Sequence, residues 1–194
     1  MVKRLGFTLI AGFAVAATPI AAQFQTPAGH DLVEAIRKRD GDKATQILDT
    51  RPKGIVNTKD EQGNTGLIIA INRSDDQWTA FLLNKGADPN LAGKGGDTPL
   101  IAAARANFST AIEWLIGMRA KVDQANRMGE TPLIIAVQQR ETQIARILLG
   151  AGADPDRSDS AAGYSARDYA TRDPRARDIL KLINDKKPRP APAH

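Results

Sequence analysis

Apolar residues recur along this chain in short blocks with helical spacing, and the blocks repeat at a fixed interval. Thr65 begins the sequence TGLIIAI, Thr98 begins TPLIAAA and Thr131 begins TPLIIAV, so the steps from 65 to 98 and from 98 to 131 are equal. A second phrase, GADP, begins at Gly86 and again at Gly152, two periods later. Such a fixed interval is typical of stacked supersecondary units that bury apolar faces against their neighbours.

Each regular unit is predicted to contain two helices. A threonine at the start of the first helix can cap it by accepting from free backbone N–H groups, and Pro99 and Pro132 suit the next position, where no N–H is needed. Trp78 and Trp114 lie at core spacing in the second helices, which favours packing over the alternative of ligand stacking. Arg119 occupies the position of Gly86 and Gly152, so a strained left-handed backbone is expected there.

The first and last units are less regular and are predicted to be caps. Asp31 is expected to cap the first helix, with His30 just before it. The last unit has Arg167 where the others have leucine, yet Tyr169 and Ile179 still belong to an inward face. Polar terminal units are required to keep a stack soluble.

These motifs resemble the ankyrin-repeat family, and the resemblance covers residues 31–184. It implies an all-α solenoid of about five helix-turn-helix units with short finger turns, at residues 30–57, 58–90, 91–123, 124–156 and 157–184. Family members usually have histidine after Thr-Pro-Leu. Apolar packing must replace its hydrogen bonds here, because this chain has Ile68, Ile101 and Ile134.

The two ends of the chain lie outside the repeats. Residues 1–22 have two positive charges, an apolar run from Leu5 to Ala17 and small residues before Gln23, a pattern that predicts a cleavable bacterial secretory signal and a periplasmic protein. The alternative, an uncleaved anchor, would need a longer apolar run, of ~20 residues, to span a bilayer. Residues 23–29 are expected to be a polar lead, and residues 185–194 a disordered, basic, proline-rich tail.

Composition argues against most catalytic and metal chemistry. The chain has no cysteine and two histidines, His30 and His194, too far apart in the chain for a shared site. The glycine-rich segment at Gly93 lacks phosphate-loop spacing, and the acidic segment at Asp154 lacks calcium-loop spacing, so both are predicted to be repeat turns. No enzyme activity, metal or cofactor is expected.

The family resemblance implies that finger tips and the ends of the first helices form a concave face. A row of basic residues along such a face would repel itself and favour an acidic partner. The alternative is that these residues simply complement helix dipoles, at ~0.3–1 kcal/mol each. The candidate partner-binding residues are Arg37, Lys38, Arg73, Arg105, Gln138, Gln139 and Arg172 in the groove, and Glu61, Gln62, Lys94, Arg127 and Met128 at the finger tips.

Two functions follow as hypotheses. The first is a non-catalytic module, a monomer, that binds an acidic protein partner in the bacterial periplasm. The second is an envelope-association protein that holds anionic polymers or lipid head groups through its basic groove and tail. The net charge of +5 is too small to indicate nucleic-acid binding, and any contact with membrane or cell wall is expected to be weak.

Overall fold

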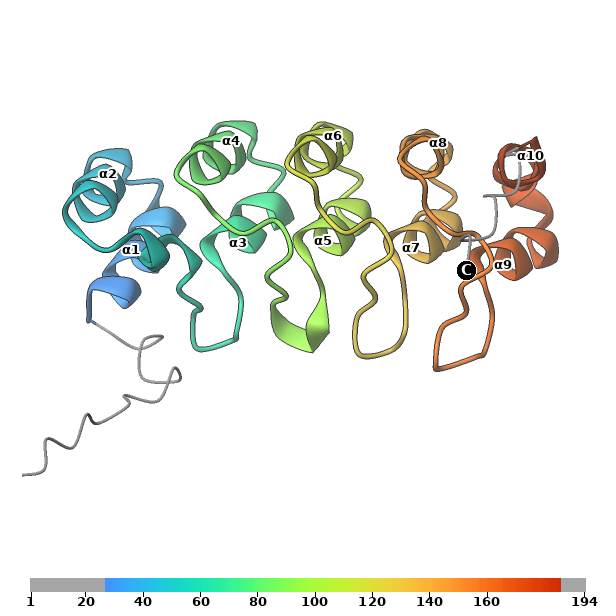
Figure 1. Cartoon of the computed structure of the whole chain (residues 1–194), viewed down its shortest axis with the longest axis horizontal. Coiled ribbons are helices and arrows are strands. Elements are labelled where there is room, and N and C mark those ends of the chain that lie inside the picture. Colours follow the sequence, from blue (N-terminus) through green and yellow to red (C-terminus); the bar gives the residue numbers. More distant parts are fainter. Residues whose placement is uncertain (1–26, 186–194) are drawn as a thin grey trace, which may run out of the picture.

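The computed structural model describes residues 27–185, which form five helical pairs stacked in one row (Figure 1). The predicted signal at residues 1–22 and residues 186–194 of the predicted tail lie outside this part of the chain. The predicted tail began one residue too early, because Asp185 is the last residue of a helix. The pairs are α1 (Pro27–Lys38) with α2 (Gly41–Thr50), α3 (Gly66–Asn72) with α4 (Asp76–Asn84), α5 (Pro99–Arg105) with α6 (Ser109–Gly117), α7 (Pro132–Gln139) with α8 (Thr142–Gly150), and α9 (Ala166–Arg172) with α10 (Arg177–Asp185).

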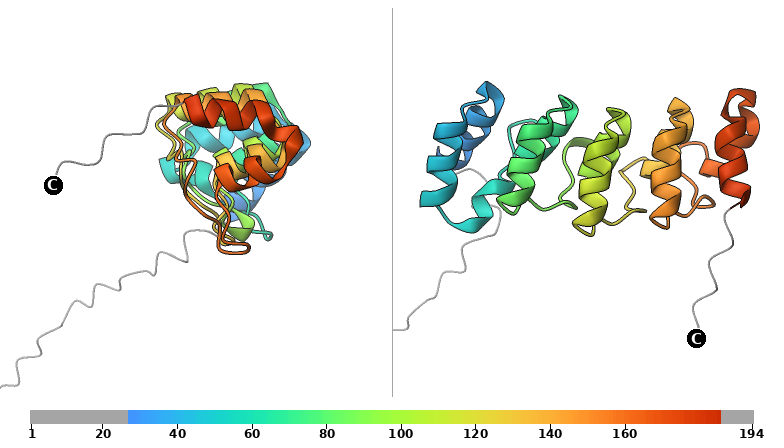
Figure 2. Two further views of the ribbon diagram at one scale, coloured as in Figure 1. Left: turned by 90° about the vertical axis from the view of Figure 1, so that its right-hand side faces the viewer. Right: turned by 90° about the horizontal axis from the view of Figure 1, so that it is seen from above.

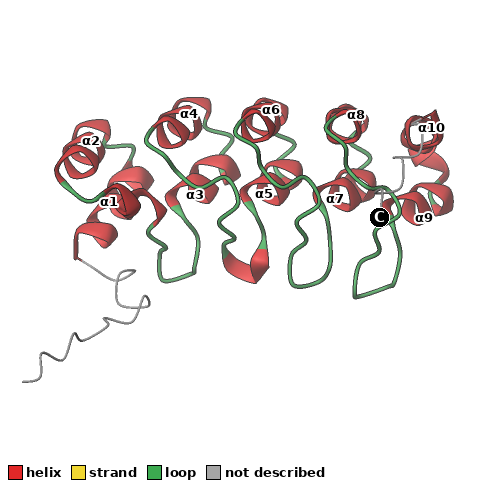
Figure 3. Cartoon of the chain, viewed as in Figure 1, coloured by secondary structure: helices red, strands yellow, loops and turns green. Residues whose placement is uncertain are grey.

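The first helices of the pairs form one layer, the second helices form another, and the long finger loops project to one side (Figures 1 and 2). Short 3-10 turns add η2 (Lys53–Asn57), η3 (Lys94–Gly96) and η4 (Pro174–Ala176). Residues 27–185 contain no strand, as Figure 3 shows. The predicted all-α solenoid of five units is confirmed.

The repeated threonines begin the first helices of the middle units as predicted. The hydroxyls of Thr65, Thr98 and Thr131 accept from the backbone N–H three residues later, at 3.2–3.3 Å. All three are buried. Because each cap is enclosed between neighbouring units, it fixes the start of the helix and the path of the finger loop before it.

The prediction for the first helix is wrong. Helix α1 begins at Pro27, within the expected polar lead, so Asp31 and His30 lie inside the helix and Asp31 does not cap it. The first unit lacks the Thr-Pro phrase that marks the later starts, and proline is favoured at a first helical position. In the same unit, Asp40 caps α2 by accepting from the N–H of Lys43 at 2.9 Å.

The core runs through all five units without a break. Ile68, Ile101 and Ile134 are at most 2% exposed, which confirms that apolar packing occupies the position of the family's histidine. Arg119 adopts the predicted left-handed backbone, with φ at 61°. None of the described helices is both long and apolar enough to cross a membrane.

Candidate functional site

The finger loops are connected to one another by hydrogen bonds. The N–H of Arg127 donates to the carbonyl of Gly95 at 3.0 Å, and the N–H of Ser160 donates to the carbonyl of Met128 at 2.8 Å. The N–H of Lys94 donates to Oδ1 of Asn64 at 3.3 Å. Each described finger is therefore positioned by its neighbour, and the tips form one continuous surface.

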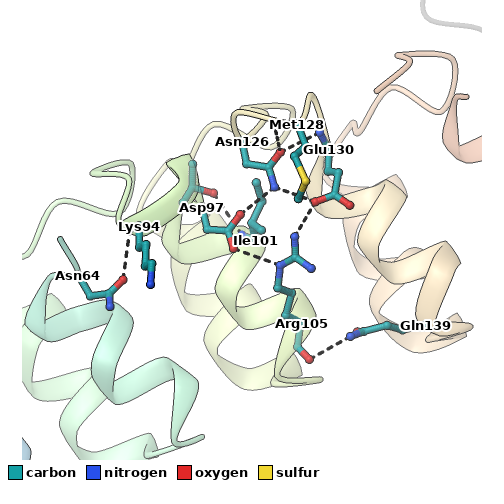
Figure 4. A network of polar contacts seen from close by, with 10 residues as sticks. Asn64, Lys94, Asp97, Ile101, Arg105, Asn126, Met128, Glu130 and Gln139 are labelled. Carbon is teal, nitrogen blue, oxygen red and sulfur yellow. Dashed lines mark hydrogen bonds and ion pairs between the residues drawn. The ribbon is translucent and has the colours of Figure 1, made fainter. Parts of the chain in front are cut away.

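A polar network joins the two central fingers to α5 (Figure 4). The guanidinium of Arg105 donates to Asp97 at 3.1 Å and to Glu130 at 2.6 Å. The amide of Asn126, 8% exposed, donates to the same two carboxylates at 2.8 Å, and its oxygen accepts from the N–H groups of Met128 and Glu130. This centre of the groove holds two carboxylates against one cation.

Further cations of the predicted groove also have intramolecular partners. Arg37 donates to the carboxylate of Asp60 at 2.7 Å and to the amide oxygen of Gln62 at 2.8 Å. Lys38 forms an ion pair with Glu34 at 3.1 Å, one turn earlier in α1. These contacts compensate the positive charge at the first end of the groove.

Other predicted groove residues cap the helix of the preceding unit. Arg73 donates to the carbonyls of Ile36 and Arg37 at the end of α1, each at 3.0 Å. Gln139 donates to the carbonyl of Arg105, at the end of α5, at 3.2 Å. Side chains that reach the last carbonyls of a helix satisfy groups that would otherwise lack a donor. The helix-end alternative thus accounts for these residues.

At the last unit, the arginines of the groove also have partners within the chain. Arg172 lies over the ring of Tyr164, with 3.9 Å from its guanidinium carbon to the ring centroid. Arg140 forms an ion pair with Asp173 at 2.6 Å. The N–H of Arg175 and the guanidinium of Arg140 lower the pKa of Asp173 to about 2, although some burial opposes them. The carboxylate therefore stays ionised at neutral pH.

Among residues 27–185, the expected self-repulsion along the groove is reduced, because Arg37 and Arg105 pair with carboxylates within the chain. The argument for an acidic partner in the groove loses this basis. Sequence reasoning missed Asp60, Asp97, Asn126 and Glu130 as partners of the groove. One signal could have found Glu130: Arg37 and Arg105 are followed, at the same separation of 25 positions, by the polar acceptors Gln62 and Glu130.

The finger-tip candidates are more accessible. Glu61, Gln62, Lys94 and Arg127 are exposed, and Met128 is 50% exposed. Gln138 is also exposed, near the end of α7. Among residues 27–185, the side chains of Lys94 and Arg127 take part in no ion pair or hydrogen bond. In the same range no cluster of three His, Asp or Glu could hold a metal ion.

The repeats match a known protein family. A family model described as ankyrin repeats (3 copies) matches residues 32–126 and, in an overlapping second match, residues 67–159. No curated protein sequence matches the chain. Ankyrin repeats are protein–protein interaction modules and are typically not enzymes. The matched residues cover all the regular units with their threonine caps and finger loops, and the chain belongs to the ankyrin-repeat family.

Proposed function

We propose that this protein is a non-catalytic interaction module that binds a protein partner through its finger tips and the adjoining concave groove. The hydrogen bonds between neighbouring fingers carry the proposal. They hold Lys94, Arg127 and Met128 on one continuous surface before any partner arrives. A surface ordered in advance loses less entropy on binding. The exposed thioether of Met128 can adapt to the shape of a partner.

The chain contains a matched pair of residues that tests this surface. Met128, at a finger tip, is 50% exposed, and Met118, at the end of outer helix α6, is 48% exposed. A photo-crosslinking amino acid at position 128 is expected to capture one protein in the native host, whereas the same group at position 118 is not. Mass spectrometry of the crosslinked bands identifies the partner and the position of the link.

The crosslinking results distinguish an interface at the finger tips from an interface on the second helices of the pairs. Capture of the same protein at both positions would point to nonspecific proximity and would contradict a finger-tip site. Capture at position 118 alone would place the interface on the outer helices instead. Similar exposure at the two positions removes accessibility as an explanation for either result.

We further propose that the protein is exported to the bacterial periplasm. Support comes from residues 1–22, where Lys3 and Arg4 precede an apolar run and small residues lie before Gln23. N-terminal sequencing of the purified protein is expected to begin at Gln23. A Val15→Asp variant places a charge in the apolar run. Its residues 1–22 are expected to remain uncleaved, and the protein is expected to stay in the cytoplasm. An intact N-terminus in the membrane fraction would indicate an anchor instead.

The alternative of an envelope-association protein gains no support from the groove. It depended on uncompensated groove cations, and Arg37, Arg73 and Arg105 have partners within the chain. Its second support, the basic tail, lies outside the described residues.

A further inference from the structure

An open cavity of about 650 Å³ lies between the stems of the last two finger loops. Three cations line it, Lys121, Arg127 and Arg157, together with one carboxylate, Asp123. The polar side chains of Asn126 and Ser160 complete much of the remaining wall. The cavity therefore has an excess of positive charge and several groups that can donate hydrogen bonds.

The cations of this cavity differ from those of the groove. None of the three forms an ion pair with another described residue. Asp123 accepts a hydrogen bond from the N–H of Asp154 at 2.9 Å, and Asp156 is held by Arg167 at 2.6 Å. With three cations and one carboxylate in its lining, the cavity keeps a net positive charge that no ion pair among residues 27–185 compensates.

The other repeats show that Lys121 replaces a structural residue. The equivalent positions, one period before and one period after it, are Asp88 and Asp154. Each of these aspartates accepts a hydrogen bond from the N–H two residues later, at 2.8 and 2.9 Å. A lysine cannot accept that bond. Lys121 therefore adds a cation to the cavity, and this turn lacks the hydrogen bond that Asp88 and Asp154 accept in the neighbouring repeats.

We infer that this cavity binds an acidic segment of the protein partner, with two or more carboxylates facing Lys121, Arg127 and Arg157. The inference rests on the proposed function, because it assigns a chemistry to that partner. Arg127 connects the cavity to the finger tips, since it precedes Met128 on the same loop. The cavity is wide and open to solvent, so it can admit an extended segment with several side chains, whereas one small inorganic anion would contact only part of its wall.

A fluorescein-labelled peptide of ten alternating glutamates and serines serves as the probe, with binding to the full chain followed by fluorescence anisotropy at low salt. The variant Lys121→Asp restores the residue of the neighbouring repeats and is expected to fold with equal or higher stability. Its affinity for the peptide is expected to fall about tenfold or more, because a cation becomes an anion beside the ligand. Arg146→Glu, on the exposed surface of α8, makes the same change in net charge and should bind as the wild type does.

Three results would overturn the inference: undiminished binding by Lys121→Asp, equal losses in both variants, or displacement of the peptide by pyrophosphate at equimolar amounts. The first would exclude the cavity, the second would indicate general charge attraction, and the third would indicate a site for compact anions. Crosslinking from position 128 in the Lys121→Asp variant distinguishes a failure of the cavity inference from a failure of the proposed function. Undiminished capture of the partner there would sustain the finger-tip site while excluding the cavity.

Discussion

Replacement of Gly129 by alanine is expected to destabilise the protein by about 2 kcal/mol, from two contributions. Gly129 has φ at +76°, where a Cβ costs roughly 1–2 kcal/mol. That Cβ would also lie 2.5 Å from the backbone nitrogen of Ser160. The last finger would have to move away, and the hydrogen bond from this nitrogen to the carbonyl of Met128 would be lost, at about 0.5–1.5 kcal/mol because both residues are exposed and water can replace the bond. Urea unfolding followed by circular dichroism measures the change.

Gly86→Ala is the matched control. Gly86 also has a positive φ, of +86°, but a Cβ there would meet no atom within 4 Å. Its cost is therefore the backbone strain alone, about 1 kcal/mol. Equal losses in the two variants would mean that the last finger accommodates the extra carbon, and that the fingers are positioned less firmly than their hydrogen bonds indicate.

The middle of the fold could be predicted from the sequence because local and repeated signals coincide there. Thr65, Thr98 and Thr131 each precede an apolar block, and each is the observed cap of a first helix. Repetition at a fixed interval turns a weak local motif into a strong one. The start of α1 at Pro27 could not be predicted in this way, because the first unit lacks the phrase and Asp31 offered an equally plausible cap.

The sequence predicted which groove positions are basic, but it did not predict their intramolecular partners. The positions of Arg37 and Arg105 follow from the repeat, yet their partners, Asp60 and Glu130, come from finger loops that are distant in the sequence. A list of basic residues on one face says nothing of the carboxylates that a neighbouring loop brings to it. The cavity at Lys121 could not be predicted for a related reason, because its lining comes from two separate fingers.

Intramolecular pairing changes how the surface of this protein is understood. Cations that hold units together, such as Arg73 on the end of α1, are poor candidates for charge-reversal tests of binding, since their loss would disturb the stack as well. Cations without an ion-pair partner in the described chain, such as Lys121 and Arg127, can be changed with less effect on the fold. The groove cations thus contribute to the assembly of the stack, whereas the finger cations without an ion-pair partner in the described chain are the ones that the proposed function assigns to recognition.

The last finger depends on one buried carboxylate, and Asp159→Ala is expected to cost about 3 kcal/mol at neutral pH. Asp159 is 6% exposed. Its Oδ1 accepts from the N–H groups of residues 161–163 at 2.7–3.0 Å, and its Oδ2 accepts from the hydroxyl of Tyr169 at 2.6 Å. Alanine would leave these donors without an acceptor, whereas Tyr169→Phe removes only one of them and should cost about 1 kcal/mol. Urea unfolding of the two variants beside the wild type measures both costs.

The same carboxylate predicts a pH dependence. Burial raises the pKa of Asp159, but the bonds from Tyr169 and the backbone outweigh it and hold the pKa below the ordinary 3.8. A carboxyl with a lowered pKa in the folded state stabilises the fold above its unfolded pKa, and this contribution disappears as the pH falls through the folded value. Asp159→Asn keeps an acceptor for the backbone and cannot ionise. The difference in unfolding free energy between wild type and Asp159→Asn should therefore narrow between pH 7 and pH 3. A constant difference over that range would show that the charge of Asp159 does not hold the finger.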